Sequence, residues 1–237
     1  MTNKLLHVLI RGWTATFRLP LLYSGTGLTS PVPPYCTLLG MIGCIAARDI
    51  KPYETKIGYY FKSDGTAIDL ERTKRLQLES KEKTNKATGK RYIEENIIPN
   101  TMKGDGIAKR QFHIRPELHL YLDNLEFKKH FEKPENIPTL GRSQDLVWIE
   151  VVEEVQCEER KSGVVSGTLL PFPTAGASGI ILLLPDWFDN DDTGYTRSIG
   201  KMSQYITVKS DVRANVAVGN LYAVERREEL IYMHNLI

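Results

Sequence analysis

Hydrophobic and polar residues alternate with a period of two in four segments of the first 155 residues, which predicts half-buried β-strands. In the third segment, Leu118, Leu120 and Leu122 would point inward, while His119 and Tyr121 would point outward. The four predicted strands span residues 4–13, 55–62, 116–123 and 140–155, and the last of them begins with a turn.

Two segments between these strands have helical spacing instead. The first helix would begin near Pro34, because proline suits the first turn of a helix. The second would span residues 124–133, because Asp123 followed by Glu126 resembles a capping box. The buried stripe of the first helix would consist of Leu38, Met41, Ile42, Ile45 and Ala46.

The order of these elements predicts an α+β fold of the ferredoxin-like or RRM type, β-α-β-β-α-β. A long insertion, about residues 63–115, falls between the second and third strands, which this topology joins as a hairpin. It would therefore project from the sheet as a thumb. We predict an RRM-like palm domain at residues 1–155 and a smaller β-rich C-terminal domain at 156–237, where short strand-like runs alternate with turn residues.

Charge is spread unevenly along the chain. The 237 residues carry a net charge of only +2, and hydrophobic and charged residues make up 41% and 25%, which is ordinary for a globular protein. Between residues 71 and 115, however, there are 12 Lys or Arg and 6 Asp or Glu, a net charge of +6, which leaves −4 for the remainder. A polyanion held by this segment fits the asymmetry. The alternative is a solvated surface excursion.

Several functions lack their sequence signatures. No apolar run approaches the roughly 20 residues of a membrane helix, and no signal-peptide pattern opens the chain. Cys36, Cys44 and Cys157 show no CxxC spacing, which disfavours disulfides and zinc and favours a reducing cytoplasm. The GxxxxGK[ST], GxSxG and HExxH motifs are absent, and we expect no cofactor. The third strand also lacks the RNP1 pattern of an RRM, so RNA would not be bound on the sheet.

Residues after the first strand have the chemistry to bind RNA. Arg11, Phe17 and Arg18 combine guanidinium groups that pair with phosphate and a ring that stacks on a base. Alternatively, Phe17 is a core residue and the arginines lie on the surface. The loop from Gly25 to Gly27 leads to a helix and resembles a phosphate cradle, although GxG alone is a weak motif.

Histidines and cations near the third strand suggest two further kinds of site. His113, Glu117 and His119 would share one strand face, but a proline interrupts the run, so we expect no metal. A metal-independent ribonuclease would use His113 as acid or base, with Lys109 and Arg110 stabilising the pentavalent phosphate. Simple contacts with the RNA backbone are the favoured interpretation of these residues.

Three segments carry a family resemblance. In order, "FRLP", "TSPVPPYCTLLGMIGCIAA" and "TLGRSQDLVWIEVV" resemble the Cas-five family, the RAMP subunit of type I CRISPR Cascade complexes, and look most like its type I-B group. Members typically show an aromatic-Arg pair, a "PPpSTLLGml" helix start and a later "LGRSeDlv" element. Cys36 and Thr37 stand where that helix start usually reads Ser-Thr. The resemblance covers about residues 4–155.

This resemblance implies a non-catalytic, cytoplasmic RNA-binding subunit in antiviral defence. Such a subunit caps the foot of Cascade and grips the repeat-derived 5′ handle of the CRISPR RNA. Its thumb would touch the first backbone subunit and its palm the large subunit, with target DNA reached through the complex and no membrane partner. The residues expected to contact RNA are Arg11, Phe17, Arg18, Gly25, Gly27, Tyr35, Thr37, Lys83, Lys86, Lys90, Arg91, Lys103, Lys109, Arg110, Arg115 and Arg142.

Other interpretations stay open at this point. One branch of the family cuts precursor RNA with a Tyr, Lys and His set, for which Tyr35 or Tyr59 with Lys109 and His113 is the best match here. In the branches that this chain most resembles, a separate ribonuclease does the cutting. A metal-independent endoribonuclease is therefore the alternative function, and a structural protein without nucleic acid is a third. Arg142 would either bind RNA or buttress its loop.

Overall fold

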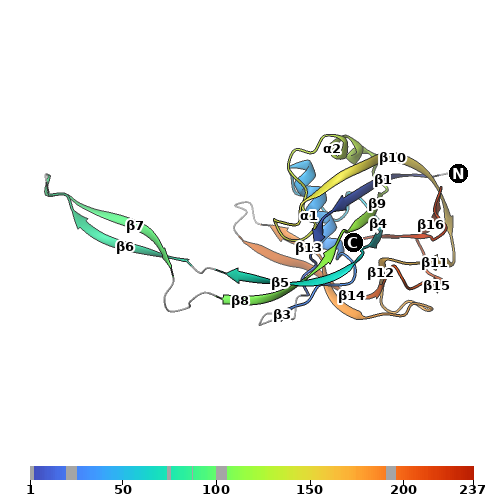
Figure 1. The fold of residues 1–237 in the computed structure, drawn as a ribbon. Coiled ribbons are helices and arrows are strands. Elements are labelled where there is room, and N and C mark those ends of the chain that lie inside the picture. Colours follow the sequence, from blue (N-terminus) through green and yellow to red (C-terminus); the bar gives the residue numbers. More distant parts are fainter. Residues whose placement is uncertain (1–2, 20–25, 74–75, 87, 100–105, 191–195) are drawn as a thin grey trace.

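The computed structural model describes residues 3–19, 26–73, 76–86, 88–99, 106–190 and 196–237 (Figure 1). Within these ranges the fold is α+β and mostly β, with two α-helices and a closed six-stranded sheet. None of the helices described is long and apolar enough to cross a membrane.

The closed sheet contains the four strands that the alternation predicted. They pair antiparallel in the order β10-β1-β9-β4. Two strands near the C-terminus, β16 and β17, pair with β10 and β4 and close the ring. The bounds are β1 (Asn3–Gly12), β4 (Ile57–Lys62), β9 (Glu117–Leu122), β10 (Val147–Arg160), β16 (Leu221–Val224) and β17 (Ile231–His234).

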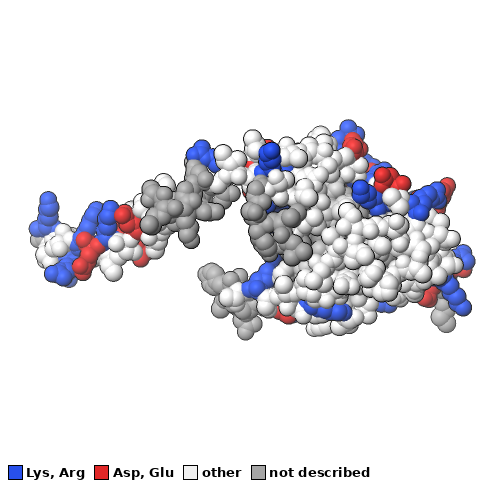
Figure 2. Space-filling view, turned by 90° about the horizontal axis from the view of Figure 1, so that it is seen from below, with Lys and Arg blue, Asp and Glu red and all other residues white. Residues whose placement is uncertain are grey.

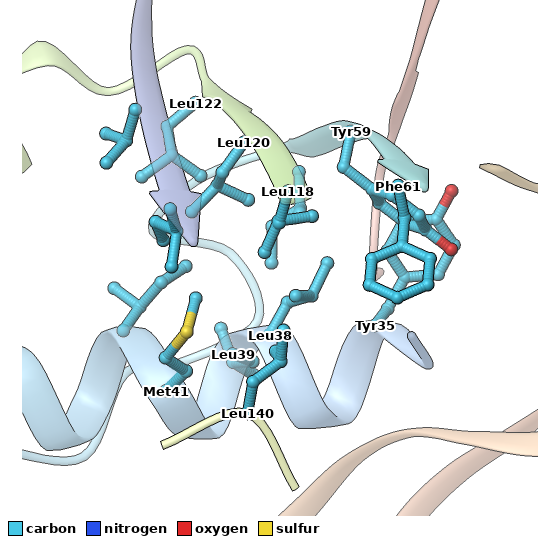
Figure 3. Close-up of a cluster of buried hydrophobic side chains, with 14 of the residues drawn as sticks. Tyr35, Leu38, Leu39, Met41, Tyr59, Phe61, Leu118, Leu120, Leu122 and Leu140 are labelled. Carbon is cyan, nitrogen blue, oxygen red and sulfur yellow. The ribbon is translucent and has the colours of Figure 1, made fainter. Parts of the chain in front are cut away.

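Helix α1 (Tyr35–Ala46) covers one face of this sheet (Figure 3). It begins directly after Pro34, and all five residues of its predicted stripe are buried, so this prediction is confirmed. Leu118, Leu120 and Leu122 point toward the helix, as the period of two requires, and form one core with it.

The second helix starts differently from the prediction. Asn124, not Asp123, accepts the capping hydrogen bond, from the backbone N–H of Glu126. Asp123 instead accepts hydrogen bonds from Thr55 Oγ1 at 3.0 Å and Lys56 N at 2.7 Å, which join it to the neighbouring strand. A 3₁₀ turn (Leu125–Phe127) therefore precedes a short α2 (Lys128–Glu132).

The face of the sheet opposite α1 is also buried, which corrects the prediction that Tyr121 points outward. Tyr121 is only 3% exposed and packs with Leu5, Val155 and Met233 inside the closed sheet. Closure by β16 and β17 is the physical reason, and Gly58 permits it, because a Cβ there would collide with Met233. The sheet face on which an RRM stacks bases is thus filled by protein.

The predicted insertion forms a long antiparallel ribbon that projects from the body (Figure 1). We call β5 to β8 the ribbon. At its tip the turn between β6 and β7 is closed by the N–H of Asn85, which donates to Lys90 O, and Gly89 has the positive φ of 68° that such a turn favours. Short strands β2 (Thr14–Ala15) and β3 (Thr26–Gly27) pair with β8 at the ribbon's base. The ribbon strands are β5 (Gly65–Thr73), β6 (Leu76–Thr84), β7 (Arg91–Pro99) and β8 (Gly106–Ile114).

The C-terminal region is β-rich, as the sequence indicated. Its main sheet has the order β12-β14-β13, and β13 packs beside α1. The predicted domain boundary at residue 155 lies inside β10, which runs on without a break. The remaining strands are β11 (Gly163–Val165), β12 (Thr168–Pro171), β13 (Ile181–Asn190), β14 (Arg197–Val208) and β15 (Ala214–Val216).

Candidate nucleic-acid interface

A cavity of about 580 Å³ opens between α1, strands β13 and β14, the turn at residues 139–142 and the base of the ribbon. Four arginines line it and one acidic residue, Glu71, faces them. We call this site the arginine cleft. Its arginines come from four separate parts of the chain and are Arg18, Arg110, Arg142 and Arg197.

Arg142 is held in the cleft by a fully buried carboxylate. Its Nε and Nη2 donate to the two oxygens of Asp145 at 3.1 and 3.0 Å, and Thr14 Oγ1 donates to the same carboxylate at 2.6 Å. Burial alone would raise the pKa of Asp145, but the hydrogen bonds from Arg142 and Thr14 outweigh it and lower that pKa. In the part of the chain that the structure describes, buried Nη1 of Arg142 has no hydrogen-bond partner.

The turn that carries Arg142 depends on Gly141. This residue has a φ of 118°, and a Cβ on it would collide with the backbone carbonyl oxygen of Thr16. Thr16 N donates to Leu140 O at 3.1 Å across the same contact. Only glycine accommodates both the conformation and the close approach, so "LGRS" encodes the position of the arginine.

Arg110 reaches the cleft from β8, where it forms an ion pair with Glu71 at 2.5 Å. Gly27 lies beside it, because β3 pairs parallel with β8 at this point. A Cβ on Gly27 would lie only 3.0 Å from Nη1 of Arg110. The structure thus gives Gly27 a role in making room for an arginine.

The N-terminal half of α1 forms another wall of the cleft. Its N-cap, Pro34, makes no side-chain capping hydrogen bond, and the first turn contains no acidic residue. The positive end of the helix dipole is therefore uncompensated and favours an anion. Thr37 and Gly40 line the cleft, and burial raises the pKa of the Cys36 thiol to about 11, so this side chain adds no negative charge at neutral pH.

Two aromatic residues predicted to contact RNA lie in the core. Phe17 and Tyr35 are each 1% exposed. Phe17 packs edge-on against Phe61, and the hydroxyl of Tyr35 donates to Leu169 O at 2.8 Å. Neither ring presents a face to a base, because both fill space between α1 and the sheet.

His113, the predicted acid or base, is 3% exposed and structurally engaged. Its Nε2 donates to Ser30 O at 2.8 Å, which leaves Nδ1 to accept from Ser63 Oγ at 3.0 Å. Burial lowers the pKa of His113, so the ring is neutral at pH 7. Lys109 lies on the same face of β8 as His113, whereas Arg110 lies on the opposite face.

The remaining predicted residues lie away from the cleft. Arg11 forms ion pairs with Glu117 at 3.0 Å and Glu150 at 2.8 Å, and Arg115 pairs with Asp64 at 3.1 Å. Lys83, Lys86, Lys90 and Arg91 lie at the tip of the ribbon. Gly25 and Lys103 fall outside the described residues.

No group of three or more His, Cys, Asp or Glu within the described ranges is arranged to hold a metal. Of the residues considered for a metal site, His113 lies in β8, whereas Glu117 and His119 lie in β9. Glu117 and His119 share one face of β9 and contact each other at 3.1 Å, but His113 does not join them, because the chain turns at Arg115, which has a φ of 47°.

Two residues of the cleft were missed by sequence reasoning. Arg197 and Phe188 come from β14 and β13 and reach the cleft through the pairing of these strands. Nothing in the spacing of either residue indicates this, because strand pairing over long distances is not visible in local periodicity. The sequence indicated strand-like runs in this region, but not which strands pair or which side chains reach the cleft.

No protein-family model and no curated protein matches this chain. Among solved structures, it aligns with a chain of a CRISPR RNA-guided surveillance complex at 14% identity and a TM-score of 0.46, covering 90% of this chain and 91% of the other. A CRISPR protein from Archaeoglobus fulgidus aligns at 14% identity and a TM-score of 0.48, covering 98% and 99%. A chain of the type III-B Cmr-beta complex bound to target RNA and AMPPnP aligns at 12% and 0.46, covering 89% and 86%. With TM-scores below 0.5, we base neither fold nor function on these likenesses.

Proposed function

We propose that this chain is a non-catalytic RNA-binding subunit of a type I CRISPR interference complex, and that it holds the 5′ handle of the CRISPR RNA in the arginine cleft. One observation carries the proposal. The three sequence segments that carry the family resemblance each contribute residues to the cleft: Arg18 from the first, Thr37 and Gly40 from the second, and Gly141 and Arg142 from the third.

The chemistry of the cleft suits single-stranded RNA. Guanidinium groups pair with phosphate oxygens through two parallel hydrogen bonds, and four arginines line the cleft. The uncapped start of α1 favours negative charge at the same place. The four arginines of the cleft outnumber the two carboxylates that pair with them, Glu71 and Asp145, which gives the cleft a positive potential.

The rest of the fold is assigned to assembly. We interpret β10-β1-β9-β4 with α1 and α2 as the ferredoxin-like palm, which would face the large subunit. The ribbon would be the thumb that meets the first backbone subunit, so that the chain caps the backbone filament. Target DNA would be reached through the complex, in the cytoplasm.

We expect no catalysis, because the best acid or base candidate is engaged in the core. Both ring nitrogens of His113 have protein partners at 2.8 and 3.0 Å. The metal-independent endoribonuclease stays the alternative function, and it makes a different prediction in the same experiment.

The test is a native gel of the purified protein with labelled repeat RNA in EDTA, scored for both shift and cleavage. We expect a shift without cleavage. Arg110→Gln should weaken the shift about tenfold, since one charge-assisted contact is lost. Arg160→Gln is the matched control, because this arginine lies outside the cleft at the end of β10, where it pairs with Glu158.

Two results would contradict the proposal. Discrete cleavage products in EDTA would make the chain a ribonuclease. If both variants lose binding equally, or if neither variant loses binding, the cleft does not hold the RNA.

A further inference from the structure

One wall of the cleft carries an aromatic ring. Phe188 of β13 lines the cleft together with Leu184 and Pro185. The register between β13 and β14 shifts twice, between Pro185 and Trp187 and again between Trp187 and Phe188. Such an irregularity re-aims the side chains around it. Trp187 packs on the core, while Phe188 is left half-buried at the cleft.

Arg197 of β14 lies over this ring. Its guanidinium carbon is 4.8 Å from the centre of the Phe188 ring, and its Nε donates to Oδ1 of Asn190 at 3.1 Å. Asn190 and Arg197 are also register partners in the β13–β14 pair, so this hydrogen bond holds the Arg197 side chain against the neighbouring strand. The result is a partly apolar surface on which the planar guanidinium of Arg197 lies over the Phe188 ring.

Across the cleft, the helix leaves room for a ligand. A Cβ built on Gly40 meets no atom within 4 Å, and Gly40 lines the same cavity as Phe188. The cleft combines apolar and aromatic lining with arginines and a helix N-terminus, which matches the two halves of a nucleotide. The base has an apolar face, and the phosphate has a charge.

We propose that Phe188 and Arg197 form a stacking platform for one unpaired nucleobase of the RNA held in the arginine cleft, an inference that rests on the proposed function. Bases stack on aromatic rings and on arginine planes wherever single-stranded RNA is splayed open. Every base has a π-face, so this platform accepts any base, and the bound class is single-stranded RNA without a strict sequence at this position.

The test uses repeat RNA in which 2-aminopurine replaces one handle nucleotide at a time, with the full-length protein. Stacking quenches this fluorophore. We expect quenching at one position with wild-type protein, its loss with Phe188→Leu, and its retention with Phe188→Trp. Affinity should fall about tenfold in Phe188→Leu, in the range measured for base–aromatic stacking. The dependence of affinity on salt should not change, because no phosphate contact is removed.

Tyr53→Leu is the matched control, because Tyr53 is an exposed aromatic residue outside the cleft. If Phe188→Leu lowers the melting temperature, Arg197→Lys takes its place. This variant keeps the charge on an exposed side chain but removes the flat guanidinium, and it should also reduce the quenching.

The outcomes separate this inference from the proposed function. Wild-type protein that does not bind repeat RNA would overturn the proposed function and this inference with it. Wild-type binding with unchanged quenching and affinity in both Phe188→Leu and Arg197→Lys would overturn the stacking platform alone.

Discussion

The arginine cleft and the outer part of the ribbon are both rich in basic residues, but their surroundings differ. In the cleft, Glu71 pairs with Arg110 and Asp145 with Arg142, so four arginines face two carboxylates. Residues 76–99 of the ribbon contain five Lys or Arg and four Glu, and these pair with one another, as Lys83 does with Glu94 and Lys81 with Glu79 at 2.8 Å. Figure 2 shows both signs of charge side by side along this part of the ribbon. Residues 76–99 therefore contribute only +1 of the net +6 counted between residues 71 and 115.

The ribbon also presents a face of highly exposed apolar side chains. The register of β6 and β7 puts Leu76, Leu78, Ile93 and Ile97 on one face, and they are 61, 60, 67 and 71% exposed. Exposed apolar residues gathered on one face with mixed charges around them are typical of protein interfaces. We therefore propose that the cleft binds RNA and that the ribbon binds a protein partner. Each prediction below can contradict this assignment of roles.

The largest effect is expected from Arg142→Ala, which removes a cleft arginine and leaves Asp145 buried without its ion pair. Breaking such a pair costs about 3 kcal/mol of unfolding free energy, and Asp145 is fully buried. Urea denaturation measures this cost, and RNA binding should be lost as well. The double variant Arg142→Ala/Asp145→Asn should recover much of the stability but not the binding. Recovery of binding would show that Arg142 only supports its turn.

Acid should weaken the side of the molecule that forms the cleft. Burial lowers the pKa of His234 from 6.5 to about 4, and its ring stacks on Tyr35, the first residue of α1. As the pH falls below 6.5, the unfolded chain takes up this proton and the folded chain does not, so stability present above pH 6.5 is lost down to about pH 4. The loss from this group is about 3 kcal/mol.

Melting temperatures at pH 7, 5.5 and 4.5 test this prediction. His234→Gln should be less stable than wild type at pH 7 but should show a weaker dependence on pH, because the titrating group is gone. An identical pH dependence in both proteins would contradict the role assigned to His234.

On the ribbon, Leu78→Ser/Ile97→Ser should leave the isolated protein within about 0.5 kcal/mol of wild type, since exposed positions contribute little. Binding to the backbone subunit should fall about tenfold or more, measured by co-purification of the assembled complex. Gln77→Ser on the other face of β6 is the control. Reduced affinity for RNA in the isolated double variant would move RNA contacts onto the ribbon.

The smallest effect is expected at Gly40. Because a Cβ there meets nothing, Gly40→Ala should raise the unfolding free energy by about 0.5–1 kcal/mol through helix propensity, measured by urea denaturation. Gly43→Ala is a contrasting control, because its Cβ would lie 2.9 Å from Arg48 O and should destabilise the helix end. Destabilisation by both substitutions would mean that the cleft beside Gly40 is closed.

Local patterns predicted the local structure well. The inward positions Leu118, Leu120 and Leu122 of β9 and the stripe from Leu38 to Ala46 depend only on neighbours in sequence, and both are confirmed. The cap at Asn124 was missed by one residue because Asp123 bonds to the distant Thr55. Closure of the sheet by β16 and β17 was not visible for the same reason, since it joins strands far apart in the chain.

The candidate site was predicted in part. Arg18, Thr37 and Arg142 were named from the motifs and lie together at the cleft. Phe17 has the chemistry to stack on a base but lies in the core, because sequence does not reveal which aromatic residues pack inward. The ribbon charges were counted correctly, but their pairing across strands depends on register, which a count does not contain.

The most direct test of the division between cleft and ribbon is the salt dependence of RNA binding by the isolated protein. Arg18→Gln/Arg110→Gln in the cleft and Lys86→Gln/Lys90→Gln at the ribbon tip remove the same charge. For single-stranded RNA each lost phosphate contact reduces the slope of log affinity against log salt by about 0.7. We predict a slope shallower by about 1.4 for the cleft variant and an unchanged slope for the ribbon variant. A shallower slope for the ribbon variant alone would contradict the account.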